Sequence, residues 1–297
     1  MANIVVGFPM NKAGVLYVNG LGLNFTTTTS IGVVAGAARD STNQCDIVLA
    51  ANTTLNAATT GVNGLDTGTL AANTFYYVFV IGSSLSANPE INIDKQYNVF
   101  AAGTTILNGT VIAEGQNTPQ PAYTVANNPQ PGVLLSLSST APTLPQGYDM
   151  FRRIGAVLTD GASHILSFWQ DDSNDSTNRE MWYDAPISVL AATAGAAFAS
   201  LSLAAAVPAI ALNGSGTRIT LQADLDPNAA ANFVELRPTG STAAAGNVKM
   251  SGDVAGVHHF DQLQAVCELS AGNASIDWIT DAASTVALAV SAYVDKL

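Results

Sequence analysis

The stretch PQGYDMFRRIGAVLTDGASHILSFWQ, residues 145–170, decides how this chain folds. It contains two apolar runs separated by Asp160-Gly161, a dipeptide that accepts positive φ angles and favours a tight connection between two β-strands. The sequence therefore predicts a β-hairpin in this stretch.

The length of the connecting loop sets the register of this hairpin. A two-residue turn places Leu158 opposite Ser163, whereas a four-residue loop at 160–163 places it opposite Ile165. Cross-strand apolar pairs stabilise a sheet by about 0.2–1 kcal/mol each, so the longer loop is the prediction. The resulting register pairs Leu158 with Ile165, Val157 with Leu166, Ile154 with Trp169, Gly155 with Phe168 and Arg152 with Asp171.

The composition of the whole chain also favours β-structure. Only 11% of the 297 residues are charged, while Ala, Thr, Ser, Asn and Gly are abundant. Glutamate and lysine, which favour helices, are scarce, so an all-β fold with many turns is expected. A surface with few charges also favours a homo-oligomer, and the alternative is a monomer with a neutral Thr/Ser/Asn surface.

Three parts are expected along the chain. Residues 1–30 alternate apolar with small or polar residues and predict an extended N-terminal arm that pairs with a neighbouring chain, or else an ordinary first strand. Residues 31–183 predict an antiparallel β-sandwich module. Inside it, a loop at 85–132 that ends in a proline cluster reads as an insertion.

Two strand patterns within these parts are specific enough to test. The run TFYYVFVIG, residues 74–82, is apolar on both faces, which predicts a central strand. Residues 184–297 contain seven short strand-like runs separated by polar turns, which predicts a second antiparallel sandwich of jelly-roll type. The runs are SLSLAAA, TRITLQA, NFVELRP, NVKMSG, VHHFDQLQAVCEL, ASIDWIT and STVALAVSAYV.

Charge, cysteine content and hydropathy exclude several classes. A net charge of −12 and dispersed basic residues argue against binding nucleic acid. Cys45 and Cys267 are expected to be unrelated thiols, with one disulfide left open. The apolar segment 185–212 contains prolines and lacks basic flanks, so buried strands are expected there rather than a membrane span. No secretory leader is expected at the N-terminus.

No pattern of catalytic or metal-binding residues stands out, so no catalytic, cofactor or metal site is predicted. His258 and His259 are neighbours in a strand-like run and face opposite ways, and His164 closes the hairpin loop. Asp171, Asp172 and Asp175 lack the glycine and glutamate of a calcium loop, although a looser oxygen site stays open. The carboxylates considered for cleavage of a polysaccharide are Asp160, Asp171, Asp172, Glu180 and Asp184, and turn or cap roles explain them more simply.

Residues 147–170, preceded by STAPTLP at 139–145, resemble a segment that recurs in structural proteins of tailed-bacteriophage particles. GAARDSTNQCDIVL (36–49) and GVNGLDTGTLAANTFYYVFVIG (61–82) resemble earlier parts of the same module. The family includes tail and head fibres, appendage adaptors and capsid decoration proteins. The C-terminal third lies outside the resemblance.

The resemblance implies a non-enzymatic virion protein, made in the host bacterial cytoplasm. A fibre or appendage protein is expected, assembled as a homotrimer and attached to capsid, portal, adaptor or tail proteins; capsid surface decoration is the alternative. A further alternative is a receptor-binding module that recognises a host surface glycan through residues 184–297. Its aromatic candidates are Trp278, Tyr183 and Trp182, although buried positions explain these residues as well.

Overall fold

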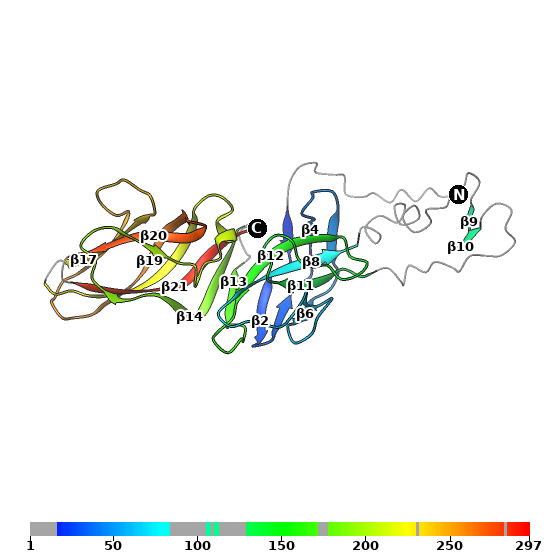
Figure 1. Cartoon of the computed structure of the whole chain (residues 1–297), viewed down its shortest axis with the longest axis horizontal. Helices are drawn as coiled ribbons and strands as arrows, with labels where there is room; N and C mark the ends of the chain where they lie inside the picture. The colour runs from blue at the N-terminus through cyan, green and yellow to red at the C-terminus, as the bar shows by residue number, and fades with distance from the viewer. Residues whose placement is uncertain are drawn as a thin grey trace.

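The computed structural model describes residues 17–83, 105–107, 110–112, 129–171, 178–229, 232–281 and 284–297. These residues form β-strands and one short 3-10 helix, with no α-helix among them. Figure 1 shows two β-rich domains arranged end to end, with the C-terminus near their junction. The predicted all-β class is confirmed, because the described chain is built from sheets packed as sandwiches, antiparallel except where β7 pairs in parallel with β11.

The N-terminal domain contains two facing sheets and a smaller third one. One facing sheet has the order β12-β8-β11-β7, and the other consists of β13-β2-β3-β6. The small sheet has the order β1-β4-β5. The strands are β1 (Val18–Gly20), β2 (Leu23–Thr27), β3 (Ser30–Val33), β4 (Gly36–Arg39), β5 (Asp46–Leu49), β6 (Thr53–Asn56), β7 (Gly64–Leu65), β8 (Phe75–Gly82), β11 (Gly132–Ser136), β12 (Met150–Leu158) and β13 (Phe168–Asp171).

The C-terminal domain is a sandwich whose layers are β14-β21-β16-β19 and β15-β20-β17-β18. The chain passes from one layer to the other where β19 leads into β20 through Ala271-Gly272, both at positive φ. Its elements are β14 (Asn178–Thr193), β15 (Ala199–Ser202), the 3-10 helix η2 (Ala209–Leu212), β16 (Thr217–Asp226), β17 (Asn232–Pro238), β18 (Val248–Gly252), β19 (His259–Ser270), β20 (Asn273–Thr280) and β21 (Thr285–Lys296).

The seven C-terminal strands predicted from the sequence are confirmed as β15 to β21. Their inner faces are buried because alternate residues are apolar; on β16 these are Ile219, Leu221, Ala223 and Leu225. The apolar segment 185–212 forms the second half of β14, strand β15 and η2. The expectation of buried strands is wrong for its first part, because residues 185–200 are all exposed or half-buried. Within the described ranges, no helix is long and apolar enough to cross a membrane.

A twelve-stranded sheet runs through both domains. Its order is β18-β17-β20-β19-β16-β21-β14-β13-β2-β3-β6, with β15 paired to β20. Strand β14 contributes to both domains, since it pairs with β13 on one side and with β21 on the other. The expected boundary between residues 183 and 184 therefore falls inside a continuous strand.

The central position predicted for residues 75–81 is confirmed. Strand β8 pairs with β11 on one side and β12 on the other. Its Tyr76, Val78 and Val80 enter the main core, while Phe79 and Ile81 form a smaller cluster on the opposite face.

The predicted hairpin at 150–170 forms at its turn only, and its predicted register is wrong. Thr159 bridges Ile165, and the backbone N–H of Leu166 donates to the carbonyl of Leu158 at 2.9 Å. The loop is therefore one residue longer than predicted. Beyond the bridge the two strands separate into different sheets, β12 joining β8 and β13 joining β14 and β2.

The physical reason lies in strand β8. It offers β12 a ladder of eight residue pairs, whereas β13 has four residues. Gly155 illustrates this, because the predicted register pairs it with Phe168. Instead it faces Leu23 of β2 across the core, where an added Cβ would lie 2.6 Å from Leu23 Cδ1.

The described part of the expected N-terminal arm belongs to the domain. Residues 18–27 form β1 and β2, and Val18, Leu21 and Leu23 are buried in the main core. The alternative of ordinary domain strands therefore holds for these residues, because their apolar positions find partners within the chain. Residues 1–16 lie outside the described residues, as does most of the expected insertion 85–132; inside it, β9 (Thr105–Leu107) pairs with β10 (Thr110–Ile112).

Two arginines, Arg153 and the buried Arg179, connect the segments that meet at the junction. Nη1 of Arg153 lies 2.7 Å from both carboxylate oxygens of Asp295, and its Nη2 donates to the carbonyl of Lys296. Arg179 donates to the carbonyls of Gly20 and Leu21. The ends of β14 and β21 are thereby fixed to β12 and β1.

Candidate functional site

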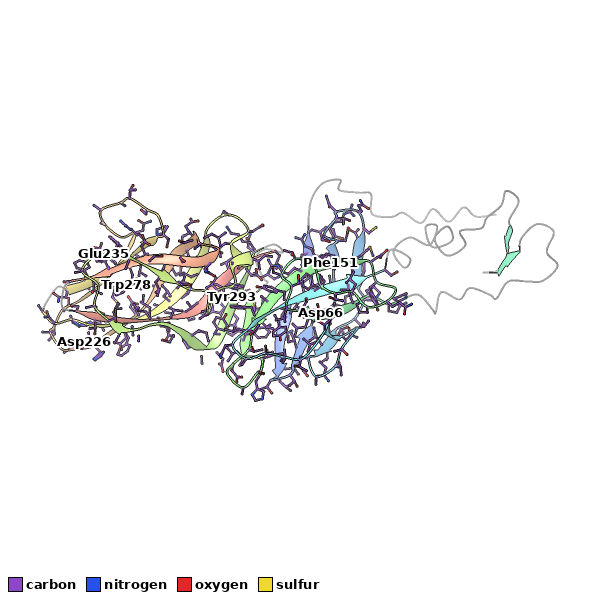
Figure 2. The ribbon with its side chains drawn as sticks, in the orientation of Figure 1. Asp66, Phe151, Asp226, Glu235, Trp278 and Tyr293 are labelled. Carbon is purple, nitrogen blue, oxygen red and sulfur yellow. The ribbon has the colours of Figure 1, made fainter. Side chains whose placement is uncertain are left out.

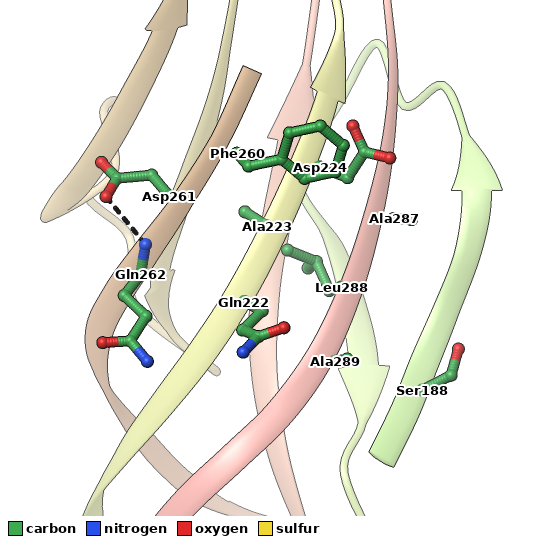
Figure 3. A pocket seen from close by; sticks show the side chains of 10 residues that line it. All are labelled: Ser188, Gln222, Ala223, Asp224, Phe260, Asp261, Gln262, Ala287, Leu288 and Ala289. Atoms are coloured by element: carbon green, nitrogen blue, oxygen red, sulfur yellow. Dashed lines mark hydrogen bonds between the residues drawn. The ribbon is translucent and has the colours of Figure 1, made fainter. Parts of the chain in front are cut away.

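The outer face of the β14-β21-β16-β19 layer carries a hollow of about 520 Å³. Figure 3 shows Ala287 and Ala289 on β21, between Gln222 and Asp224 on one side and Ser188 on the other. Strand alternation puts these alanines on the outer face, because Val286, Leu288 and Val290 turn inward and are buried. We call this hollow, with its lining side chains, the sheet-face groove.

Polar side chains from three strands border the groove. Ser188, Ala289, Gln222 and Gln262 are successive partners across β14, β21, β16 and β19 and so lie on one rung of the sheet. In the described part of the chain, the side-chain amides of both glutamines and the Ser188 hydroxyl make no hydrogen bond within the protein. Their donors and acceptors are therefore available to a ligand.

An exposed aromatic ring stands at one end of the groove. Phe260 is opposite Asp224 on the neighbouring strand and is 75% exposed. Its ring is stacked on His258, with centroids 6.1 Å apart. Asp226, next on the same face of β16, lies at the end of the molecule away from the N-terminal domain (Figure 2). The aromatic end of the groove thus faces the distal tip.

His258 is placed by two aspartates. Its Nδ1 lies 2.7 Å from Oδ1 of Asp224, and its Nε2 lies 4.0 Å from Oδ2 of Asp226. The hydrogen bond to Asp224 raises the pKa of His258 above its usual value. His259 contacts a different segment, where its Nε2 accepts from the backbone N–H of Asp253, as expected for neighbouring residues on an extended chain.

A second aromatic surface lies on the same sheet toward the N-terminal domain. Trp169 of β13 and Trp182 of β14 are opposite each other, and their rings stack with centroids 5.1 Å apart and planes within 2°. Trp169 is 52% exposed. We call this pair the tryptophan platform.

The acidic candidates of the sequence do not converge. Asp160 caps its own loop: its Oδ1 accepts from the backbone N–H groups of His164 and Ala162, and the bond from His164 lowers its pKa. Asp171 and Glu180 are paired residues at the far end of the β13–β14 ladder. Asp184 is exposed on β14, and Asp172 and Asp175 lie outside the described residues. Turn and surface roles account for the described ones.

Two of the three aromatic candidates are core residues. Trp278 is 5% exposed, and its ring contacts Gly195. Tyr183 is buried and its hydroxyl donates to the carbonyl of Ala206, while burial raises its pKa. Trp182 remains as a surface candidate through the tryptophan platform.

Thiols and metal ligands give no reactive centre within the described ranges. Cys45 and Cys267 are both free, as predicted, and burial raises the pKa of Cys267 to about 11. No three His, Cys, Asp or Glu residues in these ranges could hold a metal ion together.

Sequence reasoning missed the groove residues Gln222, Phe260 and Gln262. Part of the signal was present, because the strict alternation at 218–222 already puts Gln222 on the solvent face. The partner strands that bring Gln262 and Ala289 beside it are not evident from the sequence.

No family model matches this sequence, and a search of the curated proteins gives no match. Among solved structures, the chain is similar to a carbohydrate-binding module from Cellvibrio mixtus lichenase 5A, determined in complex with cellotriose. The TM-score is 0.20 and the identity 14%, over 44% of this chain and 87% of that one.

Proposed function

We propose that this chain is a non-enzymatic structural protein of a tailed-phage particle, and that its sheet-face groove binds a neutral glycan of the host surface. As a fibre or appendage protein it would form a homotrimer attached to the virion. The phage assignment rests on the resemblance of residues 36–49, 61–82 and 139–170 described above. The observation that carries glycan binding is the row of free amides beside an exposed ring on the distal half of the sandwich.

The side chains of the groove suit a ligand rich in hydroxyl groups. Each glutamine amide offers two donors and an acceptor, so Gln222 and Gln262 can bind neighbouring hydroxyls of a sugar. Phe260 adds a flat apolar surface for the C–H face of a pyranose ring. The groove is an open hollow over a sheet, which fits a polymer chain better than an enclosed small molecule.

Charge selects against anionic glycans. Asp224 and Asp261 line the groove, and the chain as a whole carries a net charge of −12. A sulfated or uronic-acid polymer would meet repulsion from these carboxylates. A neutral polysaccharide avoids this cost.

Binding without cleavage is the better proposal for these carboxylates. A glycosidase needs one carboxyl group that holds its proton at neutral pH, usually through burial. The side chains of Asp224 and Asp226 are 32% and 42% exposed, and both lie beside His258. Neither carboxyl group is buried, so neither fits the role of the buried acid of a glycosidase.

Replacing Phe260 with alanine is expected to weaken glycan binding about tenfold or more, because a lost ring contact costs on the order of 1.4 kcal/mol. Folding should be unaffected, since the side chain is 75% exposed. Affinity electrophoresis of the full chain through gels containing neutral bacterial polysaccharides measures the effect.

The matched control is Leu137→Ala, which removes a 54% exposed apolar side chain in the other domain. This variant should be retarded like the wild type. Free migration of the wild-type chain in every gel, or equal retardation of Phe260→Ala, would count against glycan binding in the groove.

A purely structural role, as a capsid decoration or scaffold component, is the second candidate. It is favoured by large apolar side chains left exposed on β19, Val266 and Leu269, at 43% and 44%. Burial of these residues between copies would release water from apolar surface. The trimeric state itself is implied by the resemblance to tailed-phage structural proteins. The full chain is expected to sediment as a trimer at micromolar concentration, and a stable monomer would contradict the homotrimer.

A further inference from the structure

We propose that the ligand of the sheet-face groove is an extended, unbranched neutral polysaccharide, whose chain also contacts the tryptophan platform. The N-terminal domain would then supply, through Trp169, part of a site that begins on the C-terminal domain. This inference rests on the proposed glycan binding and specifies its ligand.

The two aromatic surfaces lie on one face of one sheet. Trp169, Trp182, Ala292 and Thr220 are successive partners across β13, β14, β21 and β16 and form a single rung. Phe260 is paired with Asp224, four residues further along β16 than Thr220. At about 3.3 Å per residue, the two rungs are about 13 Å apart along the strands, which exceeds what one sugar ring covers.

The path between the two surfaces is floored by small side chains. The outward-facing partners of β16 along this part of β21 are Ala292, Ala289 and Ala287. The extra residue, Ser291, turns inward, where it is buried and its hydroxyl donates to the carbonyl of Thr220. Ala292 itself is fully buried, so the accessible part of this floor is formed by Ala289 and Ala287.

Two polar groups on the platform rung have no partner in the described part of the chain. The Thr220 hydroxyl is buried and unpaired, and so is the indole N–H of Trp182. Buried polar groups are almost always hydrogen-bonded in proteins. Two unpaired groups on one rung leave hydrogen-bonding capacity unused. Both atoms are closed to solvent, so a ligand hydroxyl pairs with them only if neighbouring side chains shift on binding.

The stacked pair is already arranged for a flat ligand. Trp182 supports one face of Trp169, which is 52% exposed. Since the outer ring is held in place, stacking of a sugar ring on it costs little ordering of the protein. Beside the platform, Arg218 lies 4.0 Å from Glu180, so its charge is partly balanced.

The test measures how affinity depends on ligand length. The full chain is titrated by calorimetry with cello-, malto- and manno-oligosaccharides from disaccharide to hexasaccharide. For the series that binds, affinity is expected to rise at least tenfold from the shortest to the longest ligand. Trp169→Ala should remove this gain while leaving the affinity for the short ligand unchanged, and Trp169→Tyr, which keeps a stacking ring, should restore most of it.

The result separates this inference from the proposed function. Phe260→Ala should weaken short and long ligands alike, because both use the distal end of the groove. If short and long ligands bind equally, or Trp169→Ala binds long ligands like the wild type, the extended site is wrong while glycan binding stands. If no oligosaccharide of any length binds, both proposals fail. Thermal unfolding of each variant confirms that it is folded.

Discussion

Asp295→Ala is expected to destabilise the protein by about 3–5 kcal/mol, because it leaves a buried arginine without its counter-charge. The Asp295 side chain is fully buried, and both its oxygens contact Arg153, whose side chain is only 10% exposed. The cost arises from desolvation of the unpaired guanidinium rather than from the attraction alone. Urea unfolding followed by circular dichroism measures the change in free energy of unfolding.

A solvent-exposed ion pair on the same sheet provides the control. Glu180 and Arg218 are 4.0 Å apart, with Arg218 56% exposed. Exposed pairs are worth about 0–1 kcal/mol, so Glu180→Ala should change stability little. Equal effects of Asp295→Ala and Glu180→Ala would show that the junction between the domains is not held by the buried pair.

Gly36→Ala is expected to cost about 3 kcal/mol, because strands β1 and β4 approach too closely for a Cβ atom. A Cβ at position 36 would lie 2.3 Å from the carbonyl oxygen of Asn19 and 2.6 Å from the backbone nitrogen of Leu21. These neighbours are backbone atoms of the segment that accepts the hydrogen bonds of Arg179, so moving them also disturbs that residue. Thermal unfolding measures the loss.

Gly32→Ala is the matched control on β3, the strand that precedes β4 in the chain. Its added Cβ would meet no atom closer than 3.5 Å, which is ordinary van der Waals contact. Alanine also reduces the freedom of the unfolded chain, so this variant should be neutral or slightly stabilised. A loss at Gly32→Ala as large as that at Gly36→Ala would contradict the close approach of β1 and β4.

Local alternation made much of the fold predictable. Strand β8 is apolar on both faces and is central, and the seven C-terminal strands coincide with apolar runs between polar turns. In each case the alternation of apolar and polar residues along the strand shows which of its faces is buried, and this needs no knowledge of the partner strands.

Pairing was less predictable than strand positions. The turn at 160–164 brings β12 and β13 close at Thr159 and Ile165, yet β12 takes β8 as its partner. That choice depends on a strand about 75 residues earlier, and nothing within the hairpin sequence encodes it. The groove shares this property, because Ser188, Gln222, Gln262 and Ala289 meet only through non-local pairing.

The tryptophans show that the role of an aromatic residue depends on which face of its strand it occupies. Trp182 and Trp278 are equally aromatic in sequence, but Trp278 points into the sandwich and is 5% exposed. Trp182 points outward, where Trp169 stacks on it. The face of the sheet to which the side chain points decides whether a tryptophan is a core residue or part of a candidate binding surface.

The most direct test of the central claim is a crystal structure of the full chain grown with the neutral oligosaccharide that binds best. We predict a sugar ring against Phe260, with hydroxyls bound to the side-chain amides of Gln222 and Gln262 above the alanine floor of β21. A sheet face covered by another copy of the chain, or a sugar bound elsewhere, would contradict the claim.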